Sequence, residues 1–153
     1  VAYRLANTLS RHGSVSRGIC TTDDDGFLLD VVERTKIEMT DEGARFRGED
    51  GNWGTLTGEE LASLNLWGFK PSVFGHLGAL FTEFLAAHRD EPRAEFFIPT
   101  VVDTLIKREL CRTRVLETDE QWFGMTYRDD RRIVVKRIAT MTEQGIYPDP
   151  LWT

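Results

Sequence analysis

Cysteine and histidine are scarce in this sequence, and this limits the metal and redox chemistry that it can support. The 153 residues include two cysteines, Cys20 and Cys111, and three histidines, His12, His76 and His88. The cysteines do not have the paired Cys-x-x-Cys spacing of a structural zinc site, and the histidines stand far apart. We therefore assign no metal site to these residues, and we expect free thiols in a reducing compartment.

Long apolar runs and blocks of basic residues are also missing. No stretch of about 18 apolar residues is present, as a membrane-spanning helix would need. The opening segment, VAYRLANTLS, lacks the basic region, apolar core and cleavage site of a signal peptide. The formal net charge is -6 at pH 7, and no run of Lys or Arg forms a basic stripe. We expect a cytoplasmic protein with neither a nucleic-acid nor a membrane partner.

The common catalytic signatures are absent as well. The sequence contains no Gly-x-Ser-x-Gly nucleophile elbow, no Walker loop and no Gly-x-Gly-x-x-Gly segment. Neither cysteine has an identifiable base near it in sequence. No complete catalytic constellation can be assembled from the residues alone.

What the sequence does contain is a series of short strand patterns that pair as hairpins. Segments 1–5, 16–22 and 27–39 read as strands, and the acidic turn DDDG joins the last two. A second hairpin is predicted where ARFRG and NWGTL flank EDG, because a glycine after acidic residues supplies the positive φ of such turns. The segment ASLNLWGF reads as a further strand, and CRTRVLET and QWFGMTY are also candidate strands.

Three helices are predicted between and after these strands. Pro71 and Ser72 precede apolar residues at helical spacing from Val73 to Leu85, which indicates an amphipathic helix facing the core. A second helix begins near Pro99, because proline fits the first turn. A third covers DDRRIVVKRIATMTEQG. These elements predict one α/β or α+β domain over residues 1–153, and the start at Val1, inside a strand pattern, predicts a part of a longer protein.

Three places in the sequence admit both a functional and a structural interpretation. The strand at 27–39 carries Glu33 followed by Arg34 and Lys36: a glutamate at a strand end can accept sugar hydroxyl hydrogen bonds and a cation can hold phosphate, or the charges simply meet solvent. Asn65 in an apolar strand is either satisfied structurally or faces a ligand. Glu95 is either a helix-entry carboxylate or a site residue.

The ordered segments RGIC, DDDGFLLDVVERTK, ASLNLWGF, EFFIPTVVD and QWFGMTY resemble the carboxyl-terminal half of the sugar-phosphate nucleotidyltransferase family, in particular a bacterial branch. The resemblance covers the chain from Ala2 to Trp152. It implies a mixed, mostly parallel sheet with flanking helices, as in a Rossmann-like fold. It also implies transfer of a nucleotidyl group from a nucleoside triphosphate to a sugar 1-phosphate, with release of pyrophosphate and with magnesium as cofactor.

The resemblance also implies roles for individual residues. Gly18 matches the glycine that contacts the sugar, and Glu33 matches the glutamate of the Glu-Lys-Pro motif that holds sugar hydroxyls. Arg34 replaces the lysine of that motif as a phosphate clamp, helped by Lys36. Two further substrate-binding positions are matched by Asn65 and Glu95.

Two departures from the family pattern bear on activity. Gly124 stands where the family has a metal-binding aspartate, with Asp119 or Glu120 as substitutes, and the glycine-rich triphosphate loop has no counterpart. We expect the chain alone to be inactive. The alternatives are a non-catalytic module that binds a sugar phosphate or nucleotide sugar, and a structural domain that assembles homo-oligomers.

Overall fold

The computed structural model describes residues 1–10, 13–48, 50–124, 128 and 130–150 of the chain. They form two compact units, Val1–Glu120 and Gln121–Thr153, which are considered separately below. Both strands and helices are present, so the predicted mixture of α and β structure is confirmed.

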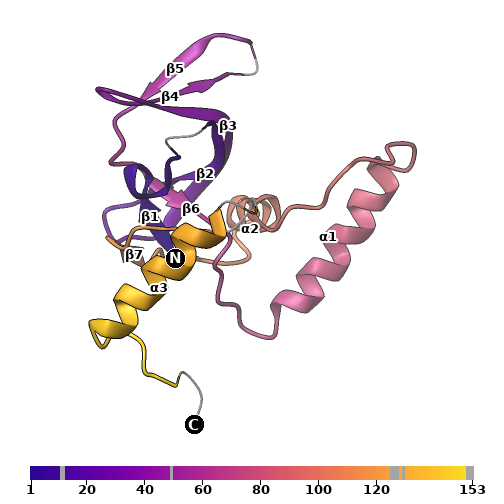
Figure 1. The fold of residues 1–153 in the computed structure, drawn as a ribbon. Coiled ribbons are helices and arrows are strands. Elements are labelled where there is room, and N and C mark those ends of the chain that lie inside the picture. Colours follow the sequence, from indigo (N-terminus) through magenta and orange to yellow (C-terminus); the bar gives the residue numbers. More distant parts are fainter. Residues whose placement is uncertain (11–12, 49, 125–127, 129, 151–153) are drawn as a thin grey trace. The chain divides into compact units, whose positions relative to one another are not determined.

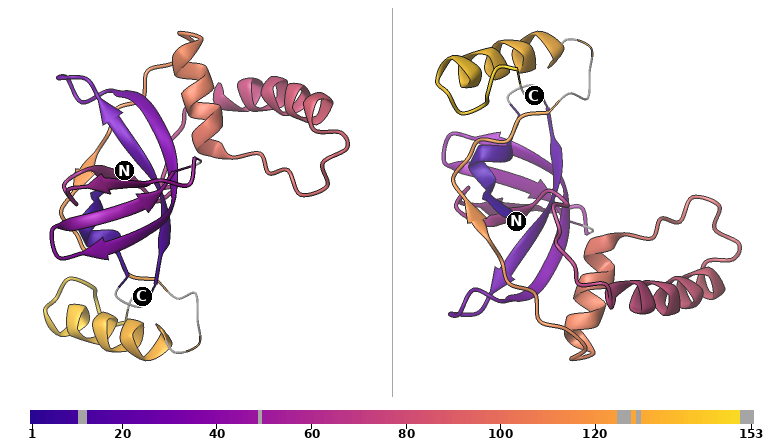
Figure 2. Two further views of the ribbon diagram at one scale, coloured as in Figure 1. Left: turned by 90° about the horizontal axis from the view of Figure 1, so that it is seen from above. Right: turned by 90° about the horizontal axis from the view of Figure 1, so that it is seen from below.

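The first unit is built on a single sheet whose strands follow the order β5-β4-β3-β2-β6-β1-β7. The strands are β1 (Ala2–Arg4), β2 (Val15–Thr22), β3 (Leu28–Thr40), β4 (Gly43–Arg47), β5 (Trp53–Leu56), β6 (Leu61–Ser63) and β7 (Glu117–Thr118), and the 3-10 helix η1 (Leu5–Thr8) follows β1. Figure 2 shows the sheet to be strongly curved.

The prediction of a mostly parallel sheet is wrong. Among the described strands only β1 and β7 pair in parallel, and every other pair is antiparallel. The physical reason is the length of the connections: tight turns join neighbouring antiparallel strands, whereas a parallel pair needs a long crossover. Here β7 reaches β1 only after both helices of this unit.

The two predicted hairpins are confirmed, and their turns explain them. In the β2–β3 turn the Asp23 carboxylate accepts hydrogen bonds from the backbone N–H groups of Asp25 (3.1 Å) and Phe27 (2.7 Å), and Gly26 has a φ of 77°. An aspartate that binds backbone two residues on is a standard turn former, and glycine adopts positive φ without strain. The β4–β5 hairpin pairs Arg47 with Trp53.

Apolar side chains of the sheet form separate clusters on its two faces. One cluster joins Leu5, Ile37, Ala44 and Ala62, with Phe46 and Leu56 packed against it. A second cluster joins Leu28, Val31 and Val102 and includes half-buried Cys20 and Trp67. The alternation of side chains along each strand separates the two clusters, so residues adjacent in a strand belong to different faces.

The helices of this unit are α1 (Val73–Ala87) and α2 (Ile98–Lys107), with Pro99 in the first turn of α2 as predicted. Figure 1 shows α2 between the sheet and α1, and α2 packs against β3. The expectation that α1 faces the core holds only in part. Val73 and Leu80 are buried, but Phe74 is 74% exposed and Leu85 is 54% exposed.

The second unit contains α3 (Asp130–Glu143), which confirms the third predicted helix, and Gly145 follows it with a φ of 75°. Residues 121–124 are not in a strand, which corrects part of the predicted strand QWFGMTY, and residues 125–127 lie outside the described residues. None of the helices in the described ranges combines the length and the apolar character that crossing a bilayer requires.

Candidate functional site

The structure brings Glu33, Gly18 and Ser63 together as a row across three neighbouring strands. Gly18 in β2 lies opposite Glu33 in β3 on one side and opposite Ser63 in β6 on the other. A Cβ atom built on Gly18 would lie 3.6 Å from Oε2 of Glu33 and 3.6 Å from Cβ of Ser63. We call these three residues the Gly18 row. It places a carboxylate and a hydroxyl beside a strand that has no side chain at this point.

The centre of this row has little room for a side chain. A Cβ atom on Gly18 would also lie 3.0 Å from Cγ2 of Val31, which belongs to a buried cluster. Gly18 is buried, whereas Glu33 as a whole is exposed. The Glu33 side chain therefore covers the glycine and presents its carboxylate at the surface.

The electrostatic setting of Glu33 has two opposing causes. Partial burial raises the pKa of Glu33 above its usual value, and the positive charge of Arg17 opposes this shift. Burial lowers the pKa of Arg17, and the charge of Glu33 opposes that change. Two hydrogen bonds hold Arg17 to Thr8. Nε of Arg17 donates to Oγ1 of Thr8 at 3.1 Å, and Nη2 of Arg17 donates to the Thr8 carbonyl at 2.6 Å. For both groups, burial favours the neutral form and the charge of the other group favours the charged form.

A small hollow of about 140 Å³ adjoins the row and shares Ser63 with it. Its other lining residues include Cys20, Trp67 and Arg114. The Cys20 thiol donates to the Gly18 carbonyl at 3.7 Å, and burial raises the pKa of Cys20 to about 11. This thiol is therefore protonated at neutral pH and is a poor nucleophile.

Arg34 is not part of this arrangement, although it follows Glu33 in sequence. Its guanidinium lies over the Phe46 ring, 4.5 Å from the centroid, and Phe46 packs in the cluster of Leu5 and Ile37. Successive residues of a strand point to opposite faces, so Glu33 and Arg34 do not form the joint sugar and phosphate clamp. A role for Arg34 in binding stays a prediction.

Lys36 lies at an irregularity of β3 and is exposed. The register between β2 and β3 shifts between the pairs Val15–Ile37 and Arg17–Arg34, and Lys36 has a φ of 51°. An extra residue on one strand is a β-bulge, which bends the strand and redirects side chains. The predicted contribution of Lys36 to phosphate binding is not tested by this geometry.

Asn65 is not a strand residue, which corrects its predicted position. β6 ends at Ser63, and Asn65 is exposed in the following turn with a φ of 59°. Its backbone N–H donates to Oγ of Ser63 at 3.3 Å, and its Oδ1 accepts from Nε1 of Trp67 at 3.3 Å. Asn65 therefore borders the Gly18 row through Ser63.

Glu95 lies elsewhere, in the groove between α1 and α2. It is exposed and shares this groove with His88, Phe96 and Arg108. None of the residues that line this groove belongs to β2 or β3. The structure does not bring Glu95 together with Glu33.

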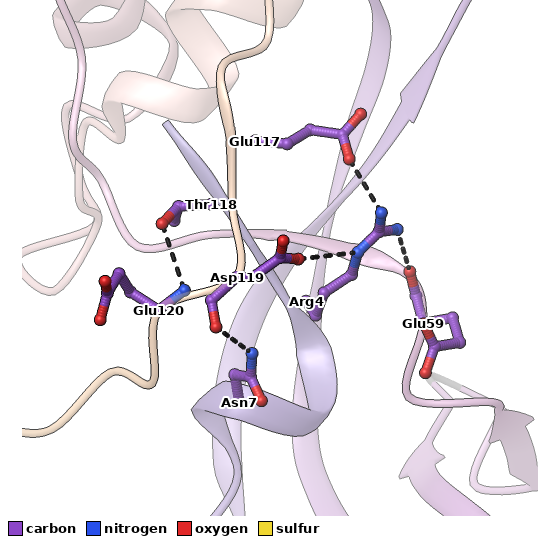
Figure 3. Close-up of polar contacts among 7 residues, drawn as sticks. All are labelled: Arg4, Asn7, Glu59, Glu117, Thr118, Asp119 and Glu120. Atoms are coloured by element: carbon purple, nitrogen blue, oxygen red, sulfur yellow. Dashed lines mark hydrogen bonds and ion pairs between the residues drawn. The ribbon is translucent and has the colours of Figure 1, made fainter.

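The proposed metal-binding substitutes lie at the end of β7. Figure 3 shows Arg4 between Glu117, at 3.1 Å, and Asp119, at 3.9 Å, while Asn7 donates to the carbonyl of Asp119 at 2.9 Å. The Asp119 side chain is 96% exposed. The Glu120 backbone N–H donates to Oγ1 of Thr118, and the Glu120 carboxylate takes no part in this hydrogen bond.

A magnesium site is not supported by these positions. Over the described ranges, no three His, Cys, Asp or Glu residues gather as metal ligands. Asp119 instead faces the positive charge of Arg4, which would compete with a cation. Gly124 is packed under Trp122, since a Cβ atom there would lie 2.5 Å from its ring. Magnesium as cofactor stays a prediction of the resemblance alone.

Two residues of this region were missed by sequence reasoning. Ser63 enters the site because β6 pairs with β2, and no local pattern gives that register. Arg17 is visible next to Gly18 in sequence, but its attachment to Thr8 depends on η1. A serine that interrupts the apolar segment LASL was the signal that could have drawn attention to Ser63.

No protein-family model matches the chain, and no curated protein matches it either. The functional assignment therefore depends on the residues themselves.

Proposed function

We propose that this chain forms the sugar-phosphate-binding part of a nucleotidyltransferase, which joins a sugar 1-phosphate to a nucleoside triphosphate. The observation that supports it most is the Gly18 row. Glu33 is a carboxylate acceptor at the surface and lies against a buried glycine, and Ser63, on the other side of that glycine, lines a hollow. A sugar needs such acceptors for its hydroxyl groups, with bonds to a charged group being the stronger ones.

Each residue of the row has a separate part in this proposal. Glu33 accepts hydrogen bonds from two adjacent sugar hydroxyls. Gly18 has no side chain of its own, and this lets the Glu33 carboxylate lie against the sheet. Ser63 offers a hydroxyl at the edge of the hollow, and the Asn65 backbone N–H that it accepts fixes its orientation. Together they orient the sugar, and orientation is a large part of catalysis of in-line phosphoryl transfer.

The experiment is calorimetric titration of the 153-residue chain with a panel of sugar 1-phosphates. We expect Glu33→Gln to weaken sugar 1-phosphate binding about 10-fold or more. The substitution replaces an ionised acceptor by a neutral amide, and hydrogen bonds to charged groups are the stronger ones. Glu38→Gln is the matched control: it makes the same change in the same strand, at a carboxylate that pairs with Arg45. Equal losses in both variants, or none in Glu33→Gln, would remove the assignment.

A second function, assembly with another protein chain, is favoured by one observation. The exposed side of α1 carries Phe74, Phe81 and Leu85. Such residues on one helix are common at interfaces. Sedimentation of the purified chain over a range of concentrations tests this alternative, and a monomer at all of them would argue against self-association.

A further inference from the structure

The groove between α1 and α2 contains a hollow of about 440 Å³. We call it the helix groove. Its volume is within the range of small-molecule sites. One face of each helix lines it, since residues three or four positions apart lie on the same face of a helix. Leu80, Phe84 and Ala87 line it from α1, and Val101 and Thr104 line it from α2.

Three phenyl rings line the helix groove, and the described part of the chain supplies no cation to them. The rings of Phe84 and Phe96 have centroids 5.3 Å apart, and Phe97 is 55% exposed. Within the described ranges, no cation–π contact involves any of these rings. The face of an aromatic ring attracts a cation, so these rings favour a positively charged ligand.

The charged residues of the groove include one carboxylate without a counter-ion. Arg108 donates to both carboxylate oxygens of Glu83, at 3.2 and 2.8 Å, and these bonds lower the pKa of Glu83. This ion pair lies at the carboxyl end of α2, about 16 Å along the helix from Phe97. Glu95 lines the groove and is exposed, and within the described ranges no donor or cation pairs with it. Glu95 is therefore the uncompensated charge of the groove.

His88 adds an acceptor to the same groove. Its Nδ1 lies 3.0 Å from the carbonyl oxygen of Phe84, which can only accept a hydrogen bond. In the neutral imidazole the proton is therefore on Nδ1, and Nε2 is an acceptor. A carboxylate, an acceptor nitrogen and aromatic faces are the groups that bind an ammonium ion.

We propose that the helix groove binds a small organic amine in its ammonium form, with an apolar body. Glu95 pairs with the ammonium group, His88 accepts one of its N–H bonds, and the apolar body lies against Phe97 and the groove wall. An anion would instead be repelled by the unpaired carboxylate. The proposal is independent of sugar binding at the Gly18 row, because the residues that line the groove lie between Leu80 and Arg108. Either site can fail without the other.

The test is a titration of the full chain with 2-phenylethylamine at neutral pH, where the amine is charged, followed by backbone amide chemical shifts. Saturable shifts at His88, Glu95, Phe96 and Phe97 are expected. 2-Phenylethanol has the ring without the charge, and methylammonium has the charge without the ring. Each should bind about 3-fold more weakly or worse. Equal affinity for the alcohol and the amine, or no saturable shift in the groove, would overturn the proposal.

Glu95→Gln tests the carboxylate. It should weaken 2-phenylethylamine binding about 3-fold, as expected for the loss of an exposed ion pair. Because Glu95 is exposed and has no partner within the described ranges, this variant should fold like the natural chain. Glu91→Gln is the matched control, since Glu91 is an exposed glutamate of the same connection and does not line the groove. Equal affinities of the two variants would rule out the proposed ion pair and with it the proposal.

Phe97→Leu tests the ring. Leucine keeps an apolar side chain but has no aromatic face, so 2-phenylethylamine binding should weaken about 3-fold. Phe74→Leu is the control, at a phenylalanine of α1 that is 74% exposed and lies outside the groove. A Phe97→Leu variant that binds the amine as tightly as Phe74→Leu does would also contradict the proposed site.

Discussion

Gly18 and Glu33 lie directly opposite each other on β2 and β3, and Oε2 of Glu33 lies 3.6 Å from the position that a Cβ atom at residue 18 would take. This relationship makes the two residues one structural unit. The glycine lets the glutamate lie against the sheet, and burial of its carboxyl raises the pKa of Glu33. A substitution at either residue should alter the packing of the other.

Gly18→Ala tests this relationship. The added methyl group would lie 3.0 Å from Cγ2 of Val31 and 3.6 Å from Oε2 of Glu33. Val31 is buried in a packed cluster and has little room to move. We expect the free energy of unfolding to fall by about 1 kcal/mol, the low end for overpacking, and sugar 1-phosphate binding to weaken. Urea unfolding and calorimetry measure the two effects.

The control for this substitution is Gly78→Ala in α1. Nothing lies within 4 Å of the position that its Cβ would take. Alanine in a helix interior should raise the free energy of unfolding by about 0.5–1 kcal/mol. A Gly18→Ala variant as stable as Gly78→Ala, with unchanged binding, would show that the glycine is not required.

Cys20 should make stability fall in alkaline solution. Burial raises its pKa to about 11 from an ordinary 9.0. The unfolded thiol ionises at the lower pH, so the stabilising contribution is complete below about pH 9 and is lost as pH rises towards 11. Between pH 8 and pH 10.5 we expect the natural chain to lose about 2 kcal/mol more than Cys20→Ala loses.

Urea unfolding of both chains at the two pH values measures this difference. Other groups titrate equally in the two chains, so only Cys20 contributes to the comparison. Parallel losses would mean that the thiol is not shielded in solution.

Arg17→Met should destabilise the first unit. It removes the donors to Thr8 and keeps an apolar side chain of similar length. Thr8 is 1% exposed, so water cannot easily replace the lost bond to its carbonyl. We expect a loss of about 2 kcal/mol in the free energy of unfolding.

The control is Arg114→Met, at an exposed arginine of the same unit. Thermal unfolding of both variants provides the comparison. An Arg17→Met variant that unfolds at the temperature of the natural chain would show that the bonds to Thr8 are dispensable.

Residues 121–153 should be dispensable for folding of the first unit. No residue of α3 is buried, and within the described ranges the apolar clusters of the first unit consist of residues before position 121. A chain ending at Glu120 should keep its β-sheet circular dichroism and a cooperative thermal transition. Loss of cooperativity would mean that the two units depend on each other.

The hairpins could be predicted from sequence because their determinants are local. Asp23 and Gly26 specify the first turn, and the strand patterns on both sides fix its length. The pairing of β1 with β6 and β7 could not be predicted in this way. It joins residues more than 50 positions apart. β7 consists of two residues, which is too short for an alternation of apolar and polar side chains to be recognised.

The site was predicted only in part for the same reason. Glu33 and Gly18 come together because they belong to one hairpin. Arg34 was assigned to the same ligand because it is adjacent in sequence, but adjacency in a strand places it on the other face. Asn65 was placed inside a strand that ends two residues earlier, where the chain turns with a positive φ.

The most direct test of the central proposal is to follow the backbone amides of Gly18 and Ser63 during titration with a sugar 1-phosphate. Saturable shifts at both amides, absent in Glu33→Gln and retained in Glu38→Gln, are the predicted result. A folded chain whose Gly18 and Ser63 amides do not move at any sugar 1-phosphate concentration would contradict sugar binding at this row.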